Sequence, residues 1–169
     1  MAEPYQQNPI RETDDEARRL ARRLIGEANY ASLAVLDEDT GFPVVSRIAV
    51  AMEMDGSPYF LASDLSGHSR ALAKDGRASI LCGVPPAKGD PLAFPRVTVI
   101  GRVTKLDRQD RNHPGRREAW LAKHPKAALY VDFGDFNFYR MRVERVSLNG
   151  GFGKAYEMTA EDLKPDAAG

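Results

Sequence analysis

Two arginines and a run of serines are the residues whose types and spacing favour the binding of an anion. An arginine interrupts an otherwise apolar, alternating stretch (PVVSRIAV), and a second one ends the serine-rich segment SDLSGHSR. The start of a helix presents unpaired N–H groups and a partial positive charge, which favour a phosphate. Hydroxyl and guanidinium groups add further donors. The candidate phosphate ligands are Arg47, Ser63, Ser66, Ser69 and Arg70.

Each of these residues also has an ordinary structural explanation. Ser66 can simply cap its helix, and Arg70 can point into water. His68 lies within the same segment and is either a ligand contact or a structural histidine. The combination is more specific than any single member, but it is less specific than a P-loop.

The sequence carries no other pattern that indicates chemistry. Its three histidines, His68, His113 and His124, share no metal-binding spacing with one another or with Cys82, which we expect to be a buried thiol. There is no Gly-x-Ser-x-Gly motif, and no pair of acids indicates glycoside hydrolysis. We predict no metal site and identify no catalytic residue, so redox chemistry would have to come from a bound cofactor.

Composition narrows the possible partners. Among 169 residues, 24 Lys and Arg balance 24 Asp and Glu, which gives no support for binding to nucleic acid or to a membrane surface. The length and the 43% hydrophobic content are typical of one domain with its own core. Since no apolar signal segment and no run of membrane length occurs, we expect a cytoplasmic protein.

Alternating hydrophobicity predicts a mainly β fold with flanking helices. Strands are expected at residues 30–36, 43–51, 59–62, 77–82, 95–106, 136–141 and 143–148. Asp55-Gly56 is expected to close a hairpin, so that the first three strands form an antiparallel meander. Short hairpins and few helices favour a small antiparallel barrel with helices packed outside it.

Helices are expected near both ends of this β region. One begins after Thr13, with Glu16 completing a capping box, and a second spans residues 107–124 with an interruption at Pro114. The polar residues 1–12 are expected to form a flexible arm, residues 13–158 the domain, and residues 159–169 a frayed tail.

Five segments carry a resemblance to a known family: PVVSRIAV, LASDLSGHSRAL, GDPLAFPRVTVIGRV, LAKHPKAALYVDFGDFNFYRM and LNGGFG. With them, the run from Ala17 to Phe152 resembles the FMN-binding split-barrel proteins related to pyridoxamine 5'-phosphate oxidase. Within that group it is most similar to the HugZ-type heme-utilisation branch. The resemblance implies an antiparallel six-stranded split β-barrel.

The resemblance also implies a homodimer that binds FMN at the interface between its subunits. Carried over to this sequence, Ser46, Arg47 and Ile48 would line the flavin, Ile48 through its backbone. The residues expected near the phosphate are Ser63, Ser66, His68, Ser69 and Arg70. Arg96 would approach from the second subunit.

The leading hypothesis is therefore a dimeric FMN-binding oxidoreductase that acts on a small-molecule substrate. The second hypothesis is a HugZ-type protein that binds or degrades heme. Some heme-degrading members take a heme-ligating histidine from a C-terminal extension, whereas this sequence has no histidine after His124. A non-catalytic flavin-binding protein is the third hypothesis, and a barrel without any cofactor is the fourth.

Overall fold

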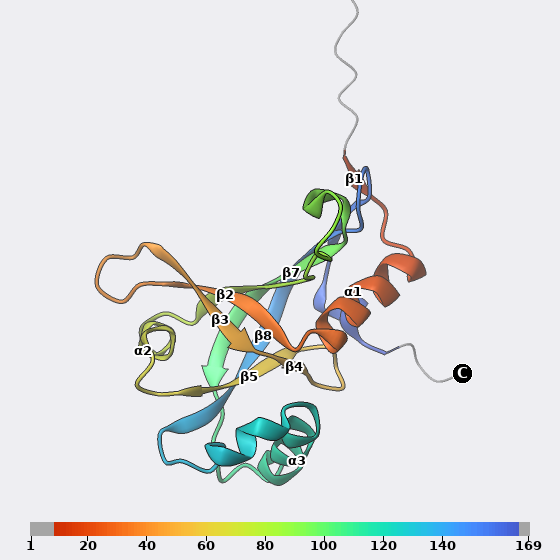
Figure 1. The fold of residues 1–169 in the computed structure, drawn as a ribbon. Coiled ribbons are helices and arrows are strands. Elements are labelled where there is room, and N and C mark those ends of the chain that lie inside the picture. Colours follow the sequence, from red (N-terminus) through yellow and green to blue (C-terminus); the bar gives the residue numbers. More distant parts are fainter. Residues whose placement is uncertain (1–8, 166–169) are drawn as a thin grey trace, which may run out of the picture.

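The computed structural model describes residues 9–165 and consists of one large β-sheet with helices packed around it (Figure 1). The elements are β1 (Ile10–Arg11), α1 (Asp15–Glu27), β2 (Tyr30–Leu36), β3 (Pro43–Ala49), β4 (Ala51–Met52), β5 (Pro58–Ser63), α2 (Gly67–Lys74), β6 (Arg77–Cys82), the 3₁₀ helix η1 (Pro91–Ala93), β7 (Arg96–Lys105), α3 (His113–Lys123), the 3₁₀ helix η2 (Pro125–Leu129), β8 (Phe136–Asn149), β9 (Ala155–Met158) and the 3₁₀ helix η3 (Ala160–Leu163). No helix within this range is long and apolar enough to cross a membrane.

The strand order along the main path of the sheet is β1-β9-β8-β7-β6-β2-β3, while β5 pairs with both β8 and β4. All of these ladders are antiparallel except β1 with β9, which is parallel. Within residues 9–165 no ladder joins β3 to β5, so hydrogen bonds do not close the sheet. The predicted mainly β fold with flanking helices is confirmed. The sheet differs from the expected six-stranded antiparallel barrel, because it has nine strands and one parallel pairing.

β8 is the central strand of the sheet, and it is continuous where the sequence predicted two strands. One half pairs with β5 and the other with β9, while β7 runs along it through a register shift at Ile100/Gly101. A Cβ atom at Gly101 would lie 2.1 Å from the Arg142 carbonyl oxygen. The close approach that Gly101 permits is therefore an approach of the protein's own β8 backbone.

The apolar stripe predicted for α1 faces the core. Ala17, Ala21 and Ile25 are buried, as the helical spacing indicates. The predicted cap is wrong by one residue, because Asp14 Oδ1 accepts from the Ala17 N–H at 2.8 Å. The Thr13 hydroxyl instead donates to the Glu157 carbonyl oxygen and so ties the helix start to β9.

α3 is shorter than predicted and is not interrupted. Pro114 lies in its first turn, where the missing N–H has no intrahelical partner to lose. Trp120 is buried, and its ring lies 5.6 Å from that of Tyr59 in β5 and 5.7 Å from that of Phe138 in β8, so α3 packs against the sheet through it. Figure 1 shows α3 beside the β5 end of the sheet.

Parts of the expected arm and tail are ordered. Ile10 and Arg11 pair with β9, and Leu163 in η3 is completely buried. Arg22 also donates a hydrogen bond to the Leu163 carbonyl oxygen. The remaining parts of the two predicted segments, residues 1–8 and 166–169, lie outside the described residues.

Candidate functional site

The serines at the start of α2 form hydrogen bonds mainly among themselves. Ser66 is the helix cap: its Oγ lies 3.3 Å from the Ser69 N–H and 2.8 Å from the Ser69 hydroxyl. The Ser66 hydroxyl also donates to the Ser63 carbonyl oxygen at 2.8 Å. Ser69 is buried. The structure therefore brings Ser63, Ser66 and Ser69 together as predicted, with hydroxyls that already have partners.

Carboxylates lie among these hydroxyls. Ser63 Oγ donates to Asp135 Oδ2 at 2.5 Å. Asp64 accepts from Tyr139 Oη at 2.7 Å, from Asn137 Nδ2 at 2.9 Å and from Lys105 Nζ at 3.1 Å. Two acids in this position disfavour a phosphate dianion, because like charges repel in a partly desolvated site.

The surroundings of Asp64 and Tyr139 shift the pKa values of both side chains. Burial acts to raise the pKa of Asp64, but the hydrogen bonds from Tyr139, Lys105 and Asn137 outweigh it and the pKa is lowered. Burial is also the main reason why the pKa of Tyr139 rises to about 12. Asp64 is thus a carboxylate and Tyr139 a neutral phenol at physiological pH.

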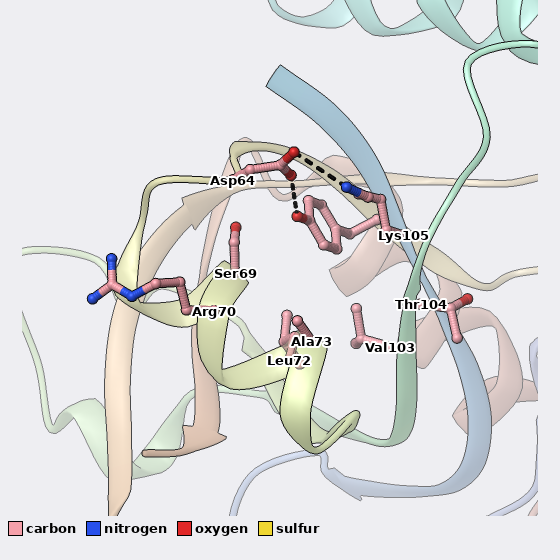
Figure 2. A pocket seen from close by; sticks show the side chains of 9 residues that line it. Asp64, Ser69, Arg70, Leu72, Ala73, Val103, Thr104 and Lys105 are labelled. Atoms are coloured by element: carbon pink, nitrogen blue, oxygen red, sulfur yellow. Dashed lines mark hydrogen bonds and ion pairs between the residues drawn. The ribbon is translucent and has the colours of Figure 1, made fainter. Parts of the chain in front are cut away.

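A cavity of about 380 Å³ lies between α2 and the end of β7 (Figure 2). Asp64, Ser69 and Lys105 line it, together with apolar residues of α2. Arg70 also lines it, yet its guanidinium extends to the side opposite Lys105 in Figure 2. That group instead donates to Glu38 Oε1 at 3.0 Å and to the Leu65 carbonyl oxygen at 2.7 Å.

Arg47 lies on the other face of the sheet from the core. The ladder places it opposite Ser32, whereas the buried Ile48 lies opposite Ala31 on the core side. The Arg47 guanidinium carbon lies 5.4 Å from the centroid of the Tyr30 ring, within cation–π range. It has no carboxylate partner among residues 9–165. Arg47 lines a separate cavity of about 220 Å³, so the structure does not bring it to the α2 serines within one chain.

The other predicted flavin contacts lie on β3 and at the start of β7. Ser46 is half-buried, Ile48 is buried, and both belong to the core-facing side of β3. Arg96 begins β7 and donates to the carbonyl oxygens of Leu92 and Phe94 at 3.1 and 3.3 Å. The residues of β7 that line the α2 cavity are at its opposite end, roughly 25 Å away at the rise of an extended strand. Arg96 remains a predicted contact from a second subunit.

The histidines and the cysteine have structural surroundings. His68 Nε2 is buried with no hydrogen-bond partner, and burial lowers its pKa. His124 Nε2 lies 3.0 Å from the Val50 carbonyl oxygen, and His113 makes an edge contact with Phe138. Burial raises the pKa of Cys82 to about 11, which makes it an unreactive thiol. Within residues 9–165, no cluster of three or more His, Cys, Asp or Glu could hold a metal ion.

Sequence reasoning missed the apolar residues that surround Arg47. Tyr30, Val45, Leu81 and Val84 are all large, and between 42% and 66% of each is exposed. The ladders place Tyr30, Val45 and Leu81 on the same outward face as Arg47, and Val84 lies two residues after the end of β6. We call these five residues the outer patch. The signal was present in the alternation, because the outward positions Tyr30, Val45 and Leu81 are large and apolar where a solvated face would be polar.

Residues 12–164 match the protein-family model described as CREG, beta-barrel. Over 126 residues the chain is 33% identical to the chloroplastic heme oxygenase HOZ of Arabidopsis thaliana, and the match covers 75% of this chain and 37% of HOZ. A heme binding protein from Mycobacterium smegmatis is also 33% identical, with a TM-score of 0.79 over 91% of this chain and 61% of that one. The chain thus spans less than two thirds of each of these relatives.

A more distant structure shows the fold alone. It is a Clostridium acetobutylicum protein of the pyridoxinephosphate oxidase family, related to general stress protein 26, with 12% identity and a TM-score of 0.67. The match covers 89% of this chain and 99% of that one. Together these findings confirm the predicted resemblance to the split-barrel proteins and to their heme-utilisation branch.

Proposed function

This chain belongs to the CREG beta-barrel family, and we propose that it binds heme on the outer patch, between the two subunits of a homodimer. The observation that carries the proposal is Arg47, a cation with no carboxylate partner among residues 9–165, set over Tyr30 in an exposed apolar surface. Such a surface suits a flat apolar ligand with an acidic group at its edge. The heme oxygenase HOZ and the mycobacterial heme binding protein support this choice of ligand.

The chemistry of heme matches the two components of the outer patch. Its macrocycle is planar and apolar, so contact with Tyr30, Val45 and Leu81 would remove apolar area from water. Such burial contributes a favourable free energy of about 25 cal/mol per Å². Its propionates are carboxylates, for which a guanidinium is the best protein partner. When bound, the heme iron would supply redox chemistry that the protein's own residues lack.

The described residues that line the Arg47 cavity include no histidine. The proposal therefore concerns the macrocycle and its propionates, and it assigns no axial ligand to the iron. His68 is the histidine with an unpartnered nitrogen, but that nitrogen is buried beside α2.

The same surface supports a homodimer. An apolar patch on an outer sheet face is costly to leave in water, and a second copy of the chain can cover it around a two-fold axis. Two copies meeting here would enclose the heme and bring two Arg47 guanidinium groups to one interface.

FMN is the second candidate ligand, and the unpartnered Arg47 favours it as well, since its phosphate is also an anion. The α2 end does not fit that phosphate as it is arranged, because Ser63, Ser66 and Arg70 have internal partners and Asp64 and Asp135 lie beside them. An FMN-dependent oxidoreductase would therefore hold the phosphate at Arg47 rather than at α2.

Parallel titrations of the purified protein with hemin and with FMN test the two candidates. Hemin is expected to give a saturable Soret band, and Arg47→Ala is expected to weaken its binding by about tenfold or more, the value of one charged hydrogen bond. Arg19→Ala is the matched control, since Arg19 is an exposed arginine of α1 without a partner in the described part of the chain.

Each result has a clear meaning. Saturable quenching of FMN fluorescence without a saturable Soret band would replace heme by FMN. Failure of both ligands to bind would overturn both candidates, as would equal losses in Arg47→Ala and Arg19→Ala. Sedimentation of the protein at several concentrations, with and without hemin, tests the homodimer.

A further inference from the structure

We propose that the cavity at the N-terminus of α3 is a separate anion site, which takes a small organic oxyanion such as a phosphate monoester or a carboxylate. The cavity has a volume of about 440 Å³ and lies between the β4–β5 turn and α3. That volume is within the range of small-molecule sites. The inference does not depend on heme or FMN binding, because it uses none of the outer-patch residues.

The main observation is a buried cation with unused donors. The Arg116 side chain is only 8% exposed, and it lines the cavity. Its Nε donates to Glu53 Oε1 at 2.8 Å, which is the only hydrogen bond its guanidinium makes within residues 9–165. Its Nη1 is buried with no partner. An oxyanion that contacts this guanidinium from the cavity would gain a charge-assisted hydrogen bond.

The helix start adds to the same field. Asn112 precedes α3 but makes no side-chain capping hydrogen bond, and Gly115 in the first turn lines the cavity. In this turn the His113 N–H donates to the Asp110 carbonyl oxygen, the Arg116 N–H donates to the Asn112 carbonyl oxygen, and Pro114 has no N–H, which leaves the Gly115 N–H. The helix dipole makes this end positive. The Gly115 N–H and the dipole therefore add to the positive potential of Arg116 and favour an anion.

Two further side chains complete the polar lining. Tyr59 is 3% exposed, and burial, followed by the charge of Glu53, raises its pKa to about 12, against an opposing effect of Arg116. Its phenol is therefore neutral and can donate to an oxyanion. Arg111 is exposed and has no partner among the described residues. With Glu53 as the one acid on the lining, the two arginines leave a formal charge of plus one.

Methionines make one side of the cavity apolar. Met52 and Met54 line it, and Met54 is 89% exposed. Methionine is flexible and polarisable, so it adapts to apolar groups of different shapes. The ligand class that fits both sides is an oxyanion on a short hydrocarbon chain.

Calorimetric titration with inorganic phosphate, butyl phosphate, butyrate and butylammonium tests the proposal. We expect butyl phosphate to bind more tightly than inorganic phosphate, butyrate to bind, and butylammonium to give no heat. Butyl phosphate binding without butyrate binding, or the reverse, selects one of the two oxyanion types. Absence of heat with all three anions to low millimolar concentration would overturn the proposal, as would equal binding of butylammonium.

Two variants and one matched control locate the binding. Arg111→Gln is expected to weaken butyl phosphate by about fivefold, and Arg116→Lys, which keeps the charge beside Glu53, by about tenfold. Arg117→Gln is the control on the same helix, because Arg117 is held by Asp132 through bonds of 2.7 and 2.8 Å. A loss in Arg117→Gln as large as in Arg111→Gln would contradict the site. Circular dichroism is used to check that Arg116→Lys is folded, and Arg111→Gln provides the test if it is not.

Discussion

The N-terminal half of α2 carries the exposed Arg70, and the outer face of β2 and β3 carries the exposed Arg47, but the two arginines differ in their partners. Arg70 is engaged by Glu38 and by the Leu65 carbonyl oxygen. Arg47 lies over the Tyr30 ring and has no carboxylate partner in the described chain. A ligand at Arg70 must compete with an internal acid, whereas an anion at Arg47 meets a guanidinium whose hydrogen bonds are available. The free arginine is therefore the better place to look for a ligand.

The remaining polar groups near α2 follow the same pattern. Asp64 accepts hydrogen bonds from side chains of β7 and β8, and the Ser63 hydroxyl donates a hydrogen bond to Asp135 in the loop before β8. These contacts fasten the start of α2 to the central strands. We infer that this region mainly stabilises the fold, while the outer patch is the surface for the proposed heme or FMN ligand.

The largest effect on stability is expected from Asp64→Ala. The change removes the acceptor of Tyr139 Oη and leaves the buried Asn137 amide with only its 3.4 Å contact to the Asp135 carbonyl oxygen, which is expected to lower the free energy of unfolding by about 2 kcal/mol. Urea denaturation measures the loss, and hemin affinity measured in parallel is expected to stay unchanged. A loss of hemin affinity comparable to that of Arg47→Ala would show that the two regions act as one site.

The ionisation of Asp64 gives the same comparison a pH dependence. Its pKa in the fold is lowered from the ordinary value of 3.8, so its charge contributes stability above pH 4 that is lost as the pH falls through the lower, folded pKa. The stability difference between wild type and Asp64→Asn is expected to be constant near neutral pH and to shrink below about pH 4. If this stability difference is unchanged in acid, the charged hydrogen bonds of Asp64 do not account for it.

Local patterns predicted much of the architecture. The strands at residues 30–36 and 77–82 have the predicted bounds, Ser66 caps α2, and the stripe containing Ile25 faces the core. Alternation and capping depend on residues a few positions apart, so the sequence displays them directly.

The hydrogen-bond partners of the predicted site residues could not be read from the sequence in the same way. Ser63 and Asp135 are 72 positions apart, and Asp64 and Tyr139 are 75 apart. The residue types at α2 could be identified as donors, but their partners are fixed by the pairing of β5 and β8. The parallel pairing of β1 with β9 could not be predicted for the same reason, since both strands are short and lie far apart in the sequence.

A smaller loss is expected from Ser66→Ala. The change removes the side-chain cap of α2, which is expected to reduce the free energy of unfolding by about 1 kcal/mol. Ser66→Thr keeps the hydroxyl and is expected to recover most of this loss. Hemin and FMN affinities are expected to stay within error of wild type, and a weakened FMN affinity in Ser66→Ala alone would return the phosphate to the α2 end.

The smallest effect is expected from Arg70→Ala, and it separates the two arginines most directly. The Arg70 and Glu38 side chains are 55% and 33% exposed, so their ion pair contributes less than about 1 kcal/mol to stability. Removing it also frees Glu38 near α2, which makes that end more negative and no better for an anion. Affinities for hemin and FMN are therefore expected to be unchanged in Arg70→Ala and reduced in Arg47→Ala, with both variants measured in the same titration series. Equal losses of FMN affinity would mean that one phosphate contacts both arginines, which requires the second subunit to bring Arg47 to α2.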